Sequence, residues 1–139
     1  MKIKIRAADR HFSWCVRERA DWRCECCGVK FPPHSRGLEC SHFYSRRHKA
    51  TRFHGDNAAA HCFLCHQRLG GDPLTFSAWI ESHLGTARAQ MIEELHHAIV
   101  KANNHYWEEA RIHYLEQKKR MILARKDGAI GRLEFESWQ

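Results

Sequence analysis

The stretch HCFLCHQRL, residues 61–69, places two cysteines and two histidines within six positions. Cys62 and Cys65 form a CxxC pair, and 34 residues separate them from an earlier pair, Cys24 and Cys27. One CxxC pair can bind a metal ion through two thiolates, and two pairs supply the four ligands of a closed tetrahedral zinc site. We therefore predict that these four cysteines bind a structural zinc ion, and that the long segment between the pairs has structure of its own.

The other cysteines are expected to lie outside this site. The chain has seven cysteines, an odd number, and its N-terminal residues contain no apolar run long enough for a secretory signal. Both features favour metal binding in a reducing compartment over a disulfide framework. Cys26 competes with Cys27 as the partner of Cys24, although a C-x-C pair is the poorer clasp. Cys15 and Cys40 are expected to be packed thiols.

The composition indicates a globular domain with a basic half. Hydrophobic residues make up 43% of the chain, and no apolar run approaches the roughly 18–20 residues of a membrane span. We therefore expect a cytoplasmic protein with no membrane partner. Residues 1–85 hold 14 of the 23 basic side chains but only 8 of the 16 acidic ones. This excess positive charge suits a polyanion such as nucleic acid, although a merely basic surface gives the same count.

Hydrophobic periodicity predicts an α+β fold in which short strands are followed by helices. Residues 1–85 are expected to form the core, and residues 86–139 a helical extension that packs on the core or forms a dimer interface. Asp72 and Pro73 have the N-cap and first-turn pattern of a helix, and Gly85 is suited to end it. The expected elements are a short strand at residues 2–5, helices over residues 9–22, 73–84, 86–102 and 105–126, a strand over residues 38–44, and helical character from residue 66.

The segment between the two cysteine pairs combines a strand histidine with a basic loop. His42 lies near the end of the expected strand, and Asn57 precedes the second CxxC pair. Between them, basic residues alternate with aromatic ones, a mixture that suits contacts to phosphates and exposed bases. The basic residues of this loop are Arg46, Arg47, Lys49 and Arg52.

This order of CxxC, strand histidine, asparagine and CxxC-His resembles the zinc-bearing HNH nucleases, also called the ββα-metal or His-Me finger group. The three HNH letters fall on His42, Asn57 and His66, in CSHF, GDNAAAHC and CFLCHQRL. More narrowly, the runs W-x-C-x-x-C-G, C-S-H-F-x-x-R, A-T-R-F, N-A-x-A and C-x-x-C-H-x-x-L-x-x-x-P are similar to the phage NinG (Rap) recombination-endonuclease family. The resemblance covers residues 9–125 and is most specific over residues 22–73.

The resemblance implies a ββα-metal core and an endonuclease that cuts branched or recombining DNA, such as Holliday junctions and D-loops, with a divalent metal. His42 then acts as the general base, a task that suits an imidazole at neutral pH. Asn57 orients it by bracing the loop, and His66 binds a catalytic Mg²⁺ or Mn²⁺ ion, with a nitrogen ligand favouring Mn²⁺. Arg46 and Arg52 grip the scissile phosphate or its neighbours. The remaining basic residues of the loop contact the DNA backbone.

The chain departs from the broader HNH pattern just before the general base. Many HNH enzymes have Asp or His there as the second metal ligand, whereas this chain has Ser41. Glu39 is the candidate for that ligand, because strand alternation places it on the same face as Ser41. An exposed strand position is an equally good reading of Glu39, and Asp56 is a further candidate ligand.

Several other residues carry explicit expectations. His61 adjoins Cys62 and is expected at the surface or in a loop, with a place at the zinc as the alternative. His96 and His97 are expected to point in different directions from a helix and not to share a metal ion. Trp107 is expected to pack within the helical half.

Two other functional interpretations stay open at this point. One is a non-catalytic, zinc-dependent DNA-binding module that serves recombination. The other is an HNH nicking or restriction-type nuclease with a different substrate preference. The helical half could also form a homodimer, and a recombination protein of the host or phage is a further candidate partner.

Overall fold

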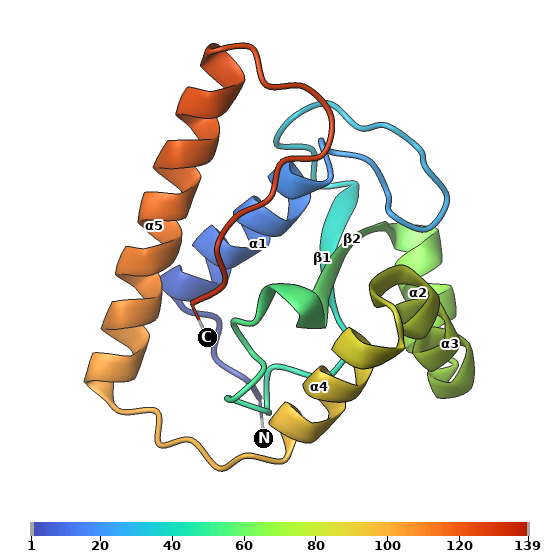
Figure 1. The fold of residues 1–139 in the computed structure, drawn as a ribbon, viewed down its shortest axis with the longest axis vertical. Helices are drawn as coiled ribbons and strands as arrows, with labels where there is room; N and C mark the ends of the chain where they lie inside the picture. The colour runs from blue at the N-terminus through green and yellow to red at the C-terminus, as the bar shows by residue number, and fades with distance from the viewer. Residues whose placement is uncertain (1, 139) are drawn as a thin grey trace.

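The computed structural model describes residues 2–138, and over these residues the chain has five α-helices and a two-stranded antiparallel sheet (Figure 1). The α+β class is therefore as expected. In chain order the elements are α1 (Ala7–Arg19), β1 (Leu38–His42), the 3₁₀ helix η1 (Gly55–Asn57), β2 (Ala58–Cys62), α2 (Phe63–Gly70), α3 (Pro73–Leu84), α4 (Thr86–His96) and α5 (Asn104–Lys126). None of the helices in residues 2–138 is long and apolar enough to cross a membrane.

The hairpin and the helix that follows it position the site. β1 pairs with β2 in a register that sets Leu38 opposite Cys62 and His42 opposite Ala58. α2 begins at Phe63, directly after β2, so the second strand runs into the helix without a loop. The three elements form a continuous β-β-α unit, which holds the second CxxC pair at the junction of strand and helix.

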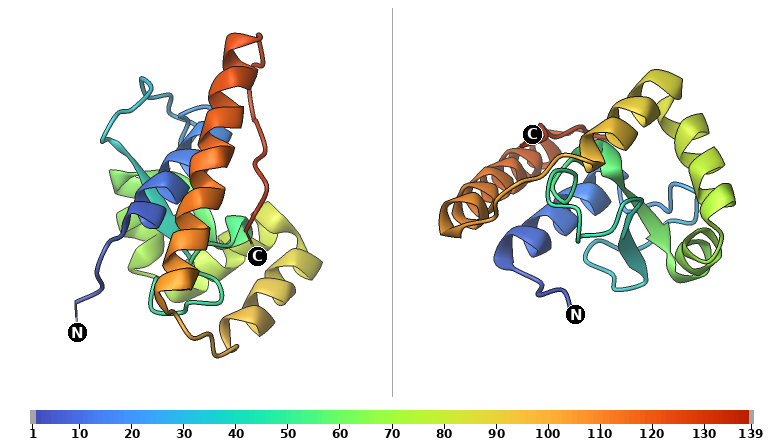
Figure 2. Two further views of the ribbon diagram at one scale, coloured as in Figure 1. Left: turned by 90° about the vertical axis from the view of Figure 1, so that its left-hand side faces the viewer. Right: turned by 90° about the horizontal axis from the view of Figure 1, so that it is seen from below.

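The main core lies between α1, the hairpin and α5. Phe12 and Val16 lie four residues apart in α1 and are fully buried, as the helical period requires. The ring of Phe12 makes edge contacts with Tyr114 of α5 at 4.9 Å and with Phe53 at 6.0 Å between centroids. The Tyr114 hydroxyl donates a hydrogen bond to the Phe53 carbonyl. Figures 1 and 2 show α5 running along α1, so the C-terminal helix packs on the core.

Local sequence signals predict some helix boundaries well and others poorly. At the start of α3 the Asp72 carboxylate accepts a hydrogen bond from the Thr75 backbone N–H at 3.1 Å, and at its end Gly85 has a left-handed φ of +87°. The helix expected over residues 86–102 ends at His96 instead. α4 buries only Ile92, so little apolar packing supports a longer helix. Residues 2–5, expected as a strand, belong to no strand or helix.

Candidate metal centre and active site

Cys24, Cys27, Cys62 and Cys65 come together as predicted. Their sulfur atoms all lie within 4.8 Å of one another, and the Cys27 and Cys62 sulfurs are 3.8 Å apart. Tetrahedral ligands at a Zn–S distance of about 2.3 Å have S···S separations of about 3.8 Å. Four free thiols at this spacing fit a zinc ion.

Backbone geometry forms each half of the cysteine cluster. In the first half, the Cys27 N–H faces the Cys24 sulfur at 3.5 Å, and Gly28 turns the chain with a left-handed φ of +81°. In the second half, Cys62 is the N-cap of α2 and Cys65 lies in its first turn, where the positive end of the helix favours thiolate. Together the two halves join the segment after α1 to the start of α2.

The pKa values of the cysteine thiols indicate that the four cannot all be thiolates without a cation among them. Burial alone would raise the pKa of Cys24, but backbone N–H groups of Cys27, Cys62 and Cys26 outweigh it and lower the value to about 7. The pKa of Cys65 is raised, first by burial and then by the three neighbouring thiols. One thiolate is therefore readily formed, and a full set of four requires positive charge among them.

The remaining cysteines lie outside the cluster, as predicted. The Cys26 sulfur accepts a hydrogen bond from Arg68 at 3.0 Å instead of joining the other four. Cys15 is fully buried, and burial raises its pKa to about 12. Burial likewise raises the pKa of Cys40 to about 11. Neither thiol has the low pKa of a reactive cysteine.

His42 and His66 line one cleft of about 360 Å³, together with Arg46. His42 comes from the end of β1 and His66 from α2, so the β-β-α unit brings them to the same cavity. His66 also contacts Glu39 of β1, with 2.9 Å between Nδ1 and Oε1. Both of these side chains are more than one-third exposed (35% and 39%), so solvent reaches the pair.

The hydrogen bonding of His42 assigns its tautomer. Its Nε2 lies 3.3 Å from the carbonyl oxygen of Arg52. A carbonyl only accepts, so Nε2 carries the proton and Nδ1 keeps a free lone pair. The buried Nδ1 has no protein partner. Burial, with a smaller contribution from Arg46, lowers the pKa of His42 to about 3, against the opposing effects of the Arg52 carbonyl and Asp9. The ring is therefore neutral at pH 7.

This buried neutral imidazole predicts an acid-labile fold. The folded pKa of His42 is about 3 and its unperturbed value is 6.5, so between these values the unfolded state binds a proton that the folded state does not. Stability is then lost as the pH falls below 6.5. Between pH 7 and pH 4 we expect wild type to lose roughly 2–3 kcal/mol more than His42→Gln in urea unfolding. The zinc site is common to both proteins. Equal losses in the two would contradict the prediction.

Asn57 braces the loop that joins the two strands. Its side chain is fully buried. The amide oxygen accepts a hydrogen bond from the Tyr44 backbone N–H at 2.8 Å. The amide nitrogen donates to the carbonyls of Tyr44 at 2.9 Å and Thr51 at 3.1 Å. The bracing role expected of Asn57 therefore has a concrete geometry, although its contacts go to the loop backbone and not to His42.

Asn57→Ala is expected to destabilise the fold by roughly 2–4 kcal/mol, because it leaves several buried backbone groups without partners. The measurement is urea unfolding at fixed zinc concentration. Asn104→Ala is a suitable control, because Asn104 is exposed in the first turn of α5. A change below about 1 kcal/mol would show that water replaces the amide, and that the loop does not depend on it.

Arg52 differs from the expectation that it grips phosphate. Its side chain is only 5% exposed, and it forms a two-point ion pair with Asp9, with distances of 2.9 Å and 2.7 Å. The same guanidinium donates to the carbonyls of Lys4 at 2.8 Å and Arg46 at 3.3 Å. Its donors are thus used inside the protein, and Arg52 anchors the loop and the N-terminal segment. Arg46, with 28% side-chain exposure, makes a longer ion pair with the same Asp9 at 3.6 Å and lines the cleft.

Asp9→Ala is expected to cost about 3–5 kcal/mol of unfolding free energy, because it leaves the buried Arg52 charge unpaired. The exposed Arg47 provides the control, and Arg47→Ala should change stability by less than about 0.5 kcal/mol. Chemical denaturation of the two zinc-loaded variants measures both values. Similar stabilities for the two variants would show that the ion pair is not needed to hold the loop.

Neither Ser41, which precedes His42, nor the alternative ligand Asp56 completes a ligand set. The Ser41 hydroxyl is buried without a protein partner. Asp56 forms a two-point ion pair with Arg88 of α4 and does not line the cleft. Of the acidic candidates named from the sequence, only Glu39 touches His66.

Two expectations about histidines are wrong. His61 is fully buried on β2, with its ring 4.6 Å from that of Trp79, and it is not part of the cysteine cluster. It faces α3, whose packing the local sequence does not reveal. His96 and His97 do not point apart: their ring centroids are 3.9 Å apart, and with the exposed Glu93 they form a group of side chains that could hold a metal ion. That they share no metal ion stays a prediction.

Sequence reasoning also missed Glu25, which lies inside the first CxxC pair. Its carboxylate is nearly buried; it accepts a hydrogen bond from the Ala60 N–H at 2.7 Å and pairs with Arg132 at 2.7 Å. Its own N–H donates to the Ala60 carbonyl at 2.8 Å. Glu25 therefore ties the first cysteine pair to β2. The only sign of this role in the sequence was an acidic residue standing between the two cysteines of a CxxC pair, in the basic half of the chain.

In comparisons with known proteins, no family model matches the chain, and neither a curated protein nor a solved structure is significantly similar to it. Function must therefore be inferred from the chemistry of the site.

Proposed function

We propose that this protein is a metal-dependent DNA endonuclease of the zinc-containing HNH type. The observation that carries the proposal is the single cleft in which the β-β-α unit holds His42 and His66 beside Arg46. The four-cysteine cluster supports this arrangement, because Cys65 and His66 are neighbours in α2. Zinc at the cysteines would fix the helix that presents His66.

His42 has the tautomer that a general base needs, whereas its pKa of about 3 lies well below the pH at which a general base works best. Its proton is on Nε2, which the Arg52 carbonyl holds, and its Nδ1 has no hydrogen-bond partner among residues 2–138. A water molecule placed at Nδ1 would lose a proton to it as it attacks the phosphorus, and the P–O bond to the leaving sugar oxygen would break. The Arg46 guanidinium in the same cleft can stabilise the negative charge that develops on the phosphate oxygens.

Glu39 and His66 would hold the catalytic Mg²⁺ or Mn²⁺ ion. Their carboxylate oxygen and ring nitrogen are in hydrogen-bond contact at 2.9 Å. The pair could supply one oxygen and one nitrogen ligand to such an ion. When bound, the ion supplies charge neutralisation and Lewis acidity.

The proposed substrate is branched or recombining DNA, with Arg46, Arg47 and Lys49 as the contacts to its backbone. All three belong to the loop that Asn57 braces, and all three line one basic cleft. This choice of DNA form rests on the resemblance of the motifs to the NinG family, while the basic cleft suits any phosphodiester backbone.

The test is a cleavage panel with purified, zinc-loaded protein. A four-way junction, a three-strand displacement loop, single-stranded DNA and plain duplex are each incubated with Mg²⁺, with Mn²⁺ or with a chelator. Metal-dependent cutting that favours the junction or the displacement loop is the expected result. Preferential cutting of plain duplex would favour the restriction-type alternative.

A non-catalytic DNA-binding module is the second candidate. Ser41 favours it, because this residue offers a buried hydroxyl where many HNH enzymes have a metal-binding Asp or His. Binding of every DNA in the panel without cutting in either metal would decide for this candidate.

A further inference from the structure

Residues 2–6, KIKIR, form the wall between two clefts. Ile3 and Ile5 line the cleft that contains His42 and His66. Lys2, Lys4 and Arg6 line a second cleft, of about 590 Å³. This alternation is typical of extended backbone, in which successive side chains point to opposite sides, except that Ile3 lines both clefts. The two clefts share Ile3 and Arg46, so they lie next to each other.

The second cleft is strongly basic. No acidic side chain lines it, and its basic residues come from the N-terminal segment and from the 46–52 loop. Asp9 pairs with two of the cations that line this cleft, Arg52 at 2.7 Å and Arg46 at 3.6 Å. Within residues 2–138, no ion pair involves the other five, which are Lys2, Lys4, Arg6, Arg47 and Lys49. Arg88, Arg111 and Arg125, by contrast, each pair with a carboxylate. Unpaired like charges along one groove repel each other until a polyanion neutralises them.

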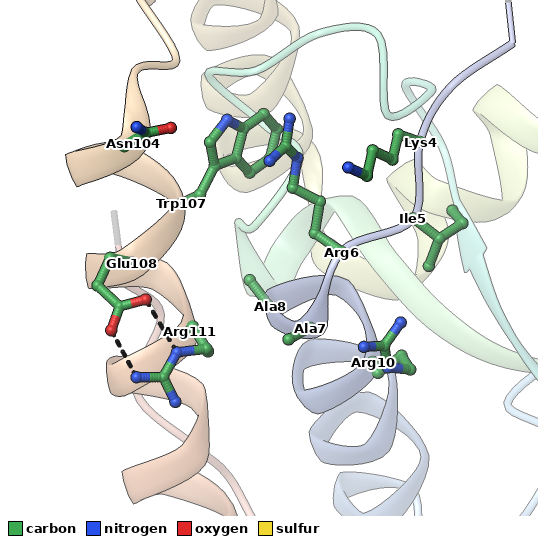
Figure 3. A pocket seen from close by; sticks show the side chains of 10 residues that line it. All are labelled: Lys4, Ile5, Arg6, Ala7, Ala8, Arg10, Asn104, Trp107, Glu108 and Arg111. Atoms are coloured by element: carbon green, nitrogen blue, oxygen red, sulfur yellow. Dashed lines mark hydrogen bonds and ion pairs between the residues drawn. The ribbon is translucent and has the colours of Figure 1, made fainter.

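Trp107 of α5 gives this groove a fixed floor. The Arg6 guanidinium lies over its indole ring at 4.2 Å from the centroid, and that of Arg52 at 4.7 Å. Figure 3 draws a neighbouring cavity that shares Lys4, Arg6 and Trp107 with this groove, and it shows Arg6 across the indole. The Arg6 backbone N–H also donates to Asp9 at 2.8 Å. The end of the segment is thus anchored on α1, and the Arg6 charge is held in place by cation–π contact.

We propose that Lys2, Lys4 and Arg6 form a track that binds the phosphate backbone of the DNA strand as it enters the His42–His66 cleft. This inference rests on the proposed nuclease function and adds a binding element outside the metal and general-base residues. Arg46 lines both clefts, so it lies where the track reaches the proposed site of cleavage. Ile3 and Ile5 form the opposite, apolar side of the same segment.

The experiment removes three charges from the track and, in a matched control, three charges from elsewhere. The test variant is Lys2→Gln/Lys4→Gln/Arg6→Gln. The control is Lys101→Gln/Lys119→Gln/Lys126→Gln, whose lysines are exposed and line none of the clefts described above. Both variants have the same net charge. Their affinities for fluorescein-labelled single-stranded and duplex oligonucleotides are measured by anisotropy across a salt series, in a His42→Ala background that prevents turnover.

The track variant should bind at least about tenfold more weakly than the control, and its log Kd against log salt should lose a slope of about 2–3, as expected for three phosphate contacts. Thermal unfolding shows that both variants are folded. Equal affinities and slopes for track and control would overturn the inference.

The track and the nuclease proposal can fail separately. If the wild type cuts DNA and the track variant, with His42 intact, cuts and binds like the control, the track is wrong and the nuclease stands. If the wild type cuts nothing but the track variant loses binding, the nuclease is wrong and the track stands as a nucleic-acid site.

Discussion

His42→Ala is expected to lower the rate of DNA cleavage by about 10²–10⁴-fold, the range for loss of a general base, while DNA affinity stays within about twofold of wild type. The variant removes Nδ1, the buried ring nitrogen that carries the lone pair and has no hydrogen-bond partner among residues 2–138. Single-turnover cleavage under saturating Mn²⁺ measures the chemical step, and anisotropy measures binding. His105→Ala provides the control, because His105 is 76% exposed on α5 and should cut like wild type.

The same assay separates a base from a metal ligand. Glu39→Ala and His66→Ala should raise the Mn²⁺ concentration needed for half-maximal cleavage, because these side chains form the proposed metal-binding pair. His42→Ala should leave that concentration unchanged while the maximal rate falls. If His42→Ala cuts at the wild-type rate, the base is another group. If it shifts the metal requirement instead, His42 belongs to the metal site.

The parts of the site that follow from the sequence are local. A CxxC pair brings its two sulfurs together within one turn of chain, so spacing alone identified Cys24, Cys27, Cys62 and Cys65. The α3 boundaries were likewise predictable from an N-cap aspartate, a proline and a terminal glycine. Such features need no knowledge of what packs against them.

The parts that did not follow depend on distant partners. Arg46 and Arg52 look alike in the sequence, and both pair with Asp9, which lies 43 positions before Arg52. Only Arg52 forms a two-point pair with it and becomes a buried anchor. His61 was expected at the surface because nothing near it in sequence reveals that Trp79 covers it. The basic cleft was missed for the same reason. It assembles the N-terminal segment, the loop and α5, three segments far apart in the sequence.

Cys62→Ser is expected to abolish zinc binding and to unfold the β-β-α unit, the largest effect on stability predicted for this chain. Structural zinc contributes about 10–16 kcal/mol of apparent binding free energy at pH 7, and little of it survives loss of a thiolate. The helix of this unit has few other contacts to replace it, because α2 buries only Cys65 and Leu69. Without zinc, α2 loses its attachment to the Cys24–Cys27 turn, and His66 loses its place in the cleft.

Cys26→Ser is a closely matched control, because it changes the same atom one residue away from a ligand. The Cys26 sulfur contacts Arg68 and lies outside the cluster, so this variant should keep one zinc per chain and the wild-type melting temperature. Elemental analysis counts the zinc, and thermal unfolding with and without a chelator shows what it stabilises. Retention of zinc by Cys62→Ser, or its loss from Cys26→Ser, would mean that the ligand set is wrong. A further outcome is a wild type that contains no zinc and melts at the same temperature with and without chelator. That outcome would show that hydrogen bonds such as the two between Glu25 and Ala60 hold the first cysteine pair to the hairpin without a metal ion.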